Sequence, residues 1–180
     1  MAAVTSVTMT AELIEMRNKL FDLREIALNI PNCIYNTTHY VRLLIRLRKP
    51  NATVAVYQTG KLVITGAKAE ISGYDAIRRV GRMIQKSGYD VKLSSVKTVN
   101  IAGTYDFKEA INLQKFSQFL GFKASMEPEL FPNLIWKDEK KTVIVSRNGK
   151  AILTGCKSTE DLNNLLIIFA NLLSKFKKNI

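Results

Sequence analysis

A nine-residue segment that occurs twice constrains this chain more than any other feature. Gly60–Lys68 (GKLVITGAK) returns as Gly149–Lys157 (GKAILTGCK), a shift of 89 residues (149 − 60), with five of the nine positions identical. Each copy opens with Gly-Lys, continues through aliphatic and β-branched residues and closes with Thr-Gly, which is typical of a strand between two turns. A shift of about half the chain predicts a duplicated unit. We expect the two repeats at 1–93 and 94–180.

Each repeat is predicted to run helix, antiparallel meander, long helix. In the first, Asp22 is expected to cap a short helix that ends at Pro31. Strands are then predicted over 33–35, 40–48, 52–57 and 60–68, followed by a helix over 69–87. The second repeat is predicted to hold strand structure over 91–105, a short helix over 113–120, strands over 134–136, 143–146 and 149–157, and a helix over 159–176 opened by a capping box at 158–161. Residues 7–11 are expected to form a strand and 12–19 to be irregular.

The predicted strand at 40–48 indicates how the sheet is covered. Leu43, Ile45 and Leu47 alternate with Arg42, Leu44 and Arg46, the period of a strand with one buried face. We therefore expect an α+β fold with one antiparallel sheet formed by both repeats, all helices on one face and the other face open. That open face would mix apolar and Thr side chains with a basic edge, as binding surfaces do. Burial by dimerisation is the alternative.

The excess of basic residues indicates what kind of molecule the protein binds. The chain holds 27 Lys and Arg against 15 Asp and Glu, a net charge of +12 and a pI of about 9.8. A domain this basic most often meets a polyanion, nucleic acid before an anionic membrane surface, although charge alone also favours solubility. No apolar run approaches the ~18 residues that span a bilayer, no secretory signal is expected, and two cysteines favour a reducing compartment.

Three motifs carry a resemblance to a known family. They are Glu127–Pro132 (EPELFP), the two nonamers with Cys156 in place of Ala, and Leu47–Pro50 (LRKP). From about Val7 onward the chain resembles the TATA-binding protein family. The resemblance implies a two-repeat saddle, a single curved antiparallel sheet of about ten strands with four helices on the convex face. The concave face of that family binds A·T-rich DNA in the minor groove, and the family is itself a standard example of kinking by apolar wedges.

The resemblance also implies a role for individual residues. The wedge positions are Tyr40, Tyr57, Phe131 and Ser146. The positions on the floor of the groove are Thr10, Val63, Thr65, Asn100, Ile152 and Thr154. The phosphate-contacting positions are Arg46, Lys61, Lys68, Lys150 and Lys157. A TFIIB-like partner would meet Glu127, Glu129 and Leu130, and regulators would meet the basic helix of Arg78, Arg79, Arg82 and Lys86. TFIIA-like factors are a further partner that the resemblance implies.

The wedge set departs from the family, which has a pair of phenylalanines in each repeat. Only Phe131 is kept, while tyrosines stand at both first-repeat positions and Ser146 leaves a void. Two functions therefore stay open. The first is a nuclear general transcription initiation factor that bends A·T-rich promoter DNA and recruits general factors and RNA polymerase. The second is an interaction platform with weak or altered TATA recognition.

Enzymatic chemistry is not expected. His39 is the only histidine, and Cys33 and Cys156 lie in or beside apolar strands, so no set of residues has the spacing of a zinc site. We expect neither a metal nor a cofactor.

Overall fold

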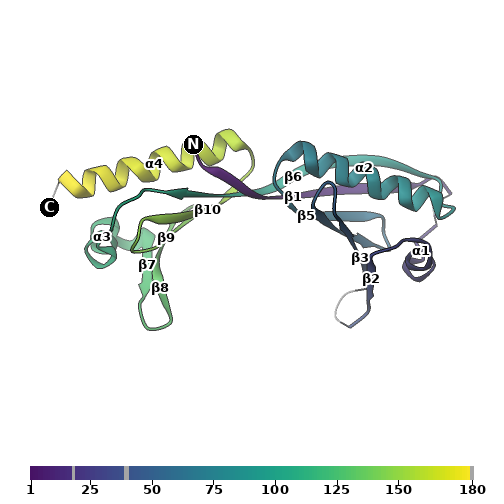
Figure 1. Ribbon diagram of the computed structural model, residues 1–180, viewed down its shortest axis with the longest axis horizontal. Helices are drawn as coiled ribbons and strands as arrows, with labels where there is room; N and C mark the ends of the chain where they lie inside the picture. Colours follow the sequence, from purple (N-terminus) through teal and green to yellow (C-terminus); the bar gives the residue numbers. More distant parts are fainter. Residues whose placement is uncertain (18, 39–40, 179–180) are drawn as a thin grey trace. The chain divides into compact units, whose positions relative to one another are not determined.

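The computed structural model describes residues 1–17, 19–38 and 41–178 (Figure 1). Over these residues the protein is α+β, with four helices and one open antiparallel sheet of ten strands, which confirms the predicted fold class. The strand order is β2-β3-β4-β5-β1-β6-β10-β9-β8-β7. The strands are β1 (Ala3–Glu15), β2 (Cys33–Asn36), β3 (Arg42–Leu47), β4 (Ala52–Tyr57), β5 (Lys61–Ala67), β6 (Val91–Asp106), β7 (Ala124–Glu127), β8 (Phe131–Asp138), β9 (Lys141–Val145) and β10 (Lys150–Cys156). The helices are α1 (Leu23–Asn29), α2 (Glu70–Lys86), α3 (Leu113–Leu120) and α4 (Thr159–Lys178), with a 3₁₀ turn at Gly121–Lys123.

The chain forms two compact units. The N-terminal unit is Ser6–Val99, and the C-terminal unit combines Met1–Thr5 with the chain from Asn100 onward. The repeat bounds expected from the sequence, 1–93 and 94–180, stay a prediction.

In the N-terminal unit one face of the strands is covered by α1 and α2 (Figure 1). Alternate strand residues such as Ile45, Val54 and Ile64 have no exposed surface, and Ile77 and Val80 of α2 are equally buried. Helix α1 begins where predicted, because the Asp22 carboxylate accepts hydrogen bonds from the backbone N–H groups of the first turn, at 2.9 and 3.0 Å.

In the C-terminal unit α3 and α4 cover the corresponding face, and the core is aromatic. The rings of Phe116 and Trp136 lie 5.8 and 5.6 Å from that of Phe169, centroid to centroid, and all three are buried. The start of α4 is capped by Ser158, whose Oγ accepts from Asp161 N at 3.0 Å. The reciprocal half of the predicted capping box differs, because the Asp161 carboxylate accepts from Lys157 N instead.

The structure corrects two expectations about secondary structure. Residues 12–15 were expected to be irregular but extend β1, because Leu13 is buried and its N–H donates to Gly60 O at 2.9 Å. Strand β7 was not predicted, since four residues (ASME) are too few for their alternation to stand out. Its pairing with β8 also shifts register between Ser125 and Glu127. In the described part of the chain, no helix combines the length and the apolar character that a bilayer span requires.

Candidate functional site

The face of the N-terminal unit turned away from its helices is built from rows of directly opposed residues. One row runs Leu44, Ala55, Val63, Thr10 across β3, β4, β5 and β1. A second runs Arg46, Thr53, Thr65. Because opposed residues in antiparallel strands share a face, the predicted groove-floor residues of this unit lie together, with Arg46 at the edge.

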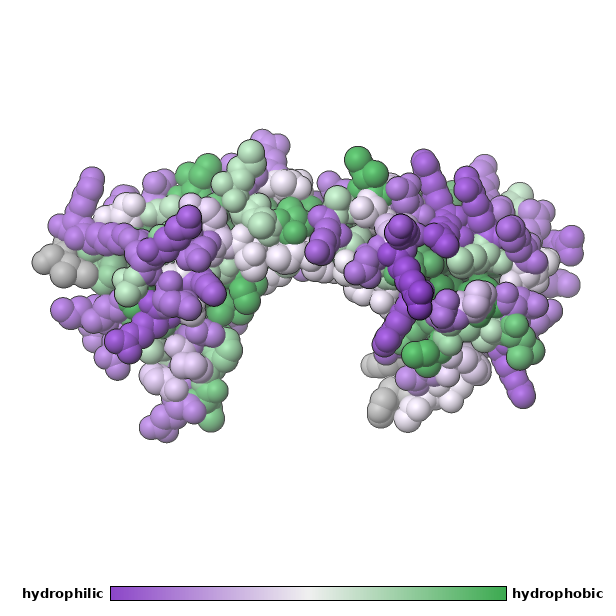
Figure 2. All heavy atoms as spheres, viewed as in Figure 1, coloured by the Kyte–Doolittle hydropathy of each residue, from purple (hydrophilic) through white to green (hydrophobic). Residues whose placement is uncertain are grey.

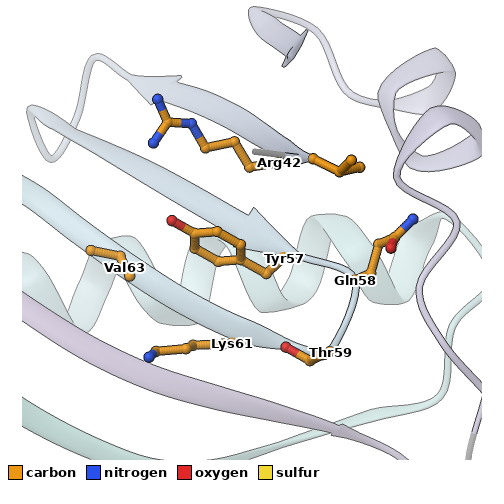
Figure 3. Close-up of a pocket in the computed structure, with 7 residues that line it drawn as sticks. Arg42, Tyr57, Gln58, Thr59, Lys61 and Val63 are labelled. Carbon is orange, nitrogen blue, oxygen red and sulfur yellow. The ribbon is translucent and has the colours of Figure 1, made fainter. Parts of the chain in front are cut away.

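Tyr57 and Arg42 occupy the next row. They are opposed across β4 and β3, and Figure 3 shows both side chains, with Val63 and Lys61, on one side of the strands while a helix passes behind. The side chains of Tyr57, Arg42, Lys61 and Val63 line a hollow of about 540 Å³. The Nε of Arg42 is buried without a hydrogen-bond partner among the described residues. An aromatic ring beside two cations and an aliphatic floor suits an anionic partner that also offers a flat apolar surface.

The open face of the C-terminal unit repeats this arrangement. Its central row is Thr104, Ile152, Ile144, Ile135, Ser125, and Ile152 is 48% exposed. Next to it lie the pairs Asp106–Lys150 and Thr154–Thr142. Phe131, which is 40% exposed, begins β8 in phase with Ile135 and opposite Glu127. The predicted floor residues Ile152 and Thr154 of this unit therefore share one face, and Phe131 lies at the start of β8.

Ser146 differs from the other wedge positions because it belongs to a turn. Its Oγ donates to Lys150 O at 3.0 Å and contacts the Asn148 side chain, and Ser146 N donates to the same carbonyl at 2.9 Å. The hydroxyl thus stabilises the β9–β10 hairpin and offers no apolar surface.

Asn100 is held by β10. Its Oδ1 accepts from Gly155 N at 2.8 Å, and the Thr154 Oγ1 lies 3.2 Å from Asn100 Nδ2 and 3.4 Å from Oδ1. The predicted floor residues Asn100 and Thr154 therefore form one polar cluster.

The predicted cations and partner residues are mostly accessible. Arg46, Lys61, Lys68, Lys150 and Lys157 are all exposed. On α2, Arg78, Arg79, Arg82 and Lys86 are exposed too, and Figure 2 shows hydrophilic side chains gathered where Figure 1 draws that helix. The Arg79 side chain already makes a hydrogen bond within the protein, because its guanidinium donates to Lys49 O.

The β7–β8 hairpin displays the residues expected to meet a TFIIB-like partner. Glu127 and Glu129 are exposed and Leu130 is 82% exposed, with Leu130 N donating to Glu127 O at 3.0 Å across the turn. An exposed leucine next to two carboxylates is a surface on which apolar and cationic groups could dock.

Tyr40, the remaining predicted wedge, and His39 lie outside the described residues. Arg42 was missed as a site residue, although its alternation with Leu43 already placed it on the face of Arg46. Burial raises the pKa of both the Cys33 and the Cys156 thiol, so neither is an activated nucleophile. Within residues 1–17, 19–38 and 41–178, no three His, Cys, Asp or Glu side chains come together as metal ligands.

These observations define a two-repeat α+β protein with an open, half-apolar and basic sheet face in each unit. Comparison with known proteins identifies the family. The family model described as "Transcription factor TFIID (or TATA-binding protein, TBP)" matches residues 3–87 and 95–176. The chain therefore belongs to the TATA-binding protein family, whose members are DNA-binding transcription factors and not enzymes.

Relatives and a solved structure agree with that assignment. The chain is 37% identical over 160 residues to the TATA-box-binding protein of Candida albicans, and this alignment covers 88% of this chain and 67% of the relative. It is 36% identical over 159 residues to that of Saccharomyces cerevisiae, covering 87% and 66%. The solved structure titled "Methanococcus jannaschii TBP" superposes with a TM-score of 0.84 at 25% identity, covering 96% of this chain and 97% of that one. The chain thus spans about two thirds of the length of its yeast relatives.

Proposed function

We propose that the protein is a general transcription initiation factor that binds the minor groove of A·T-rich promoter DNA through the open faces of its two units and bends it. The observation that carries the proposal is the row Leu44, Ala55, Val63, Thr10 and its counterpart around Ile152. Aliphatic and Thr side chains without charge suit the minor groove of A·T pairs, which offers only acceptors, because the Thr hydroxyls can donate to them. The exposed lysines and arginines beside these rows would contact the phosphates.

The wedges support bending of unequal strength. Tyr57 and Phe131 present rings on the open faces, whereas Ser146 presents a hydroxyl that is bonded within its own turn. Unstacking a base step costs a few kcal/mol, part of which a stacked ring recovers. We therefore propose that the kink contacted by Phe131 and Ser146 is the weaker one, and that phosphate contacts carry a larger share of the affinity.

We further propose that Glu127, Glu129 and Leu130 bind a TFIIB-like factor, and that the basic face of α2 binds TFIIA-like or other regulators. Nuclear localisation and delivery of RNA polymerase to the promoter follow from the same proposal.

A second candidate function is a platform that holds general factors while binding TATA elements weakly. Ser146 favours it, because one wedge position offers no ring. A second copy of the chain covering the open face is a further proposal, and sedimentation of the DNA-free protein tests it.

Duplex binding with inosine tests the minor-groove proposal. An I·C pair looks like A·T in the minor groove but like G·C in the major groove. We expect A·T and I·C versions of one TATA-like duplex to bind alike in fluorescence anisotropy, and the G·C version to bind at least about tenfold more weakly. Equal affinity for all three would favour the platform function. A preference for A·T over I·C would contradict reading from the minor groove.

A further inference from the structure

The two long helices have the same buried side but different exposed sides. Their buried residues correspond at a shift of 89 (162 − 73): Gly73, Ala76, Ile77, Val80 and Ile84 of α2 match Leu162, Leu165, Leu166, Phe169 and Leu173 of α4. At the same shift, the exposed Arg78, Arg79 and Arg82 of α2 match Ile167, Ile168 and Asn171 of α4, which are also exposed. Helix α4 therefore carries uncharged side chains where its counterpart carries three arginines.

The exposed side of α4 forms a continuous stripe. The residues that define this α4 stripe are Glu160, Asn164, Ile167, Ile168, Asn171 and Lys175, all of them exposed. Their spacing puts them on one side of the helix, opposite the buried side. No residue between Asp161 and Lys175 is charged, and Ile167 and Ile168 are 57% and 44% exposed. The middle of the stripe is thus an uncharged surface with two exposed isoleucines, which favours contact with another protein surface.

The α4 stripe is symmetric about its own centre. The point midway between Ile167 and Ile168 is also midway between Asn164 and Asn171, and midway between Glu160 and Lys175. A two-fold axis at this point would turn a second copy of the helix end for end and lay it on the first. Isoleucine would then meet isoleucine, asparagine would meet asparagine, and each carboxylate would meet an ammonium group. A parallel pair would instead set like charges together at both ends.

The charges at the two ends of the stripe are available for such a contact. Within residues 1–17, 19–38 and 41–178, neither Glu160 nor Lys175 takes part in an ion pair. They lie about 22 Å apart along the helix axis, because an α-helix rises 1.5 Å per residue, so they cannot pair within one copy. An antiparallel second copy would supply an opposite charge to both.

We infer that two copies of the chain associate through their α4 stripes, antiparallel, about a two-fold axis between Ile167 and Ile168. One pair of helices is a small interface, so the expected dissociation constant is on the order of 10 μM. Helix α4 covers the face of the C-terminal unit opposite its open face, and this dimer leaves the open face uncovered. The inference therefore does not depend on the proposed DNA-binding function, and it describes a different dimer from one that buries the open face.

Sedimentation equilibrium of the DNA-free protein tests the association, over concentrations from about tenfold below to about tenfold above that constant. We expect reversible conversion of the 20.3 kDa monomer into a dimer. Ile167→Arg and Ile168→Arg give α4 the side chains that α2 has at the matching positions, and each should weaken the dimer at least about tenfold. Leu28→Arg is the matched control, because it adds the same charge at an exposed apolar residue of α1, and it should leave the dimer unchanged. A monomer at every concentration, or a dimer that the two α4 variants do not weaken more than the control, would overturn the inference.

Exchanging the end charges tests the antiparallel arrangement. Glu160→Lys and Lys175→Glu each replace two opposite-charge contacts by two like-charge contacts, and each should weaken the dimer about threefold or more. An equal mixture of the two variants restores both opposite-charge contacts, so mixed dimers should form about as tightly as the natural dimer. FRET between differently labelled copies measures the mixed dimer, and misfolding cannot produce this gain. A mixture that associates no better than either variant alone would overturn the inference.

Discussion

Arg42 and Tyr57 are directly opposed on β3 and β4, and their side chains share the open face of the N-terminal unit. This places a guanidinium next to the ring that is proposed to enter the DNA. Because the minor groove of A·T-rich DNA concentrates negative potential, a cation beside the wedge would favour insertion of the ring.

Replacing Arg42 tests that relationship. Arg42→Ala is expected to weaken binding to a TATA duplex by about 1–2 kcal/mol and to lower the slope of log affinity against log salt by about one. Arg82→Ala on α2 is the control, since Arg82 lies on the helix that covers the other face. Anisotropy titrations at several salt concentrations measure both quantities. Equal losses for the two variants would show that Arg42 contributes only net charge.

Ser146→Phe should strengthen bending. A ring at this position would add stacking surface beside Phe131 and recover part of the cost of unstacking one base step. We expect a larger change in FRET between dyes at the two ends of the duplex, with tighter binding. Ser146→Ala removes the hydrogen bond to Lys150 O without adding a ring, and no gain is expected from it. An unchanged FRET signal for Ser146→Phe would mean that the second wedge position does not contact DNA.

The sequence predicted which strand residues share the open face of each unit where the two repeats agree, and their contacts with DNA stay a prediction. The nonamers placed Val63, Thr65, Ile152 and Thr154 on one face because strand residues alternate strictly. The alternation does not predict which group a side chain bonds, such as the Gly155 N–H that donates to Asn100. Such a bond depends on the register between strands that are distant in sequence.

The misses have physical causes as well. Strand β7 is an edge strand of four residues whose burial alternates only between half-buried and exposed, so it lacks the fully buried apolar positions that reveal longer strands. Arg42 lies outside the motifs that carry the family resemblance, whereas the alternation of β3 places it on the open face with Arg46.

The glycines of the first nonamer should differ in their tolerance of a side chain. A Cβ at Gly60 would lie 2.1 Å from Leu13 O, and φ is +86°. Gly60→Ala is therefore expected to lower the free energy of unfolding by more than about 2 kcal/mol. At Gly66, where φ is +82° and no atom lies within 4 Å of a Cβ, Ala should cost only about 1 kcal/mol. Urea unfolding measures both, and equal losses would contradict the close approach of β1 to Gly60.

The Lys141–Asp161 ion pair should make stability depend on pH. The hydrogen bond from Lys141, followed by that from Lys157 N, lowers the pKa of Asp161. A lowered carboxyl pKa contributes stability above its unfolded value of about 4, and this contribution is lost as the pH falls through the folded pKa. Asp161→Asn should therefore cost about 1 kcal/mol or less at pH 7 and nothing at the lowest pH where the protein still folds.

Asp138→Asn is the matched control, because the Lys123–Asp138 pair is more exposed, at 46% and 34% against 34% and 28% for Lys141 and Asp161. It should change stability less. A loss for Asp161→Asn that stays constant with pH would indicate packing instead of charge.

Leu130→Ala and Glu129→Arg should separate partner binding from DNA binding. Both side chains are exposed at the tip of the β7–β8 hairpin, so folding should be unaffected. We expect at least about tenfold weaker binding of a TFIIB-like factor to the protein–DNA complex, as for removal of an interface anchor. Affinity for DNA alone should stay within about twofold. If both variants bound the TFIIB-like factor as tightly as the natural protein, the hairpin tip would not be its contact site.

The central claim is that the open faces bend A·T-rich DNA from its minor groove, and bend-sensitive FRET tests it most directly. The natural protein is titrated onto a short TATA duplex and a G·C-rich duplex, each labelled at both ends, at two salt concentrations. We predict a saturable FRET change on the TATA duplex alone, smaller at the higher salt but still selective. Binding without a FRET change, equal on the two duplexes and lost as salt rises, would contradict the account.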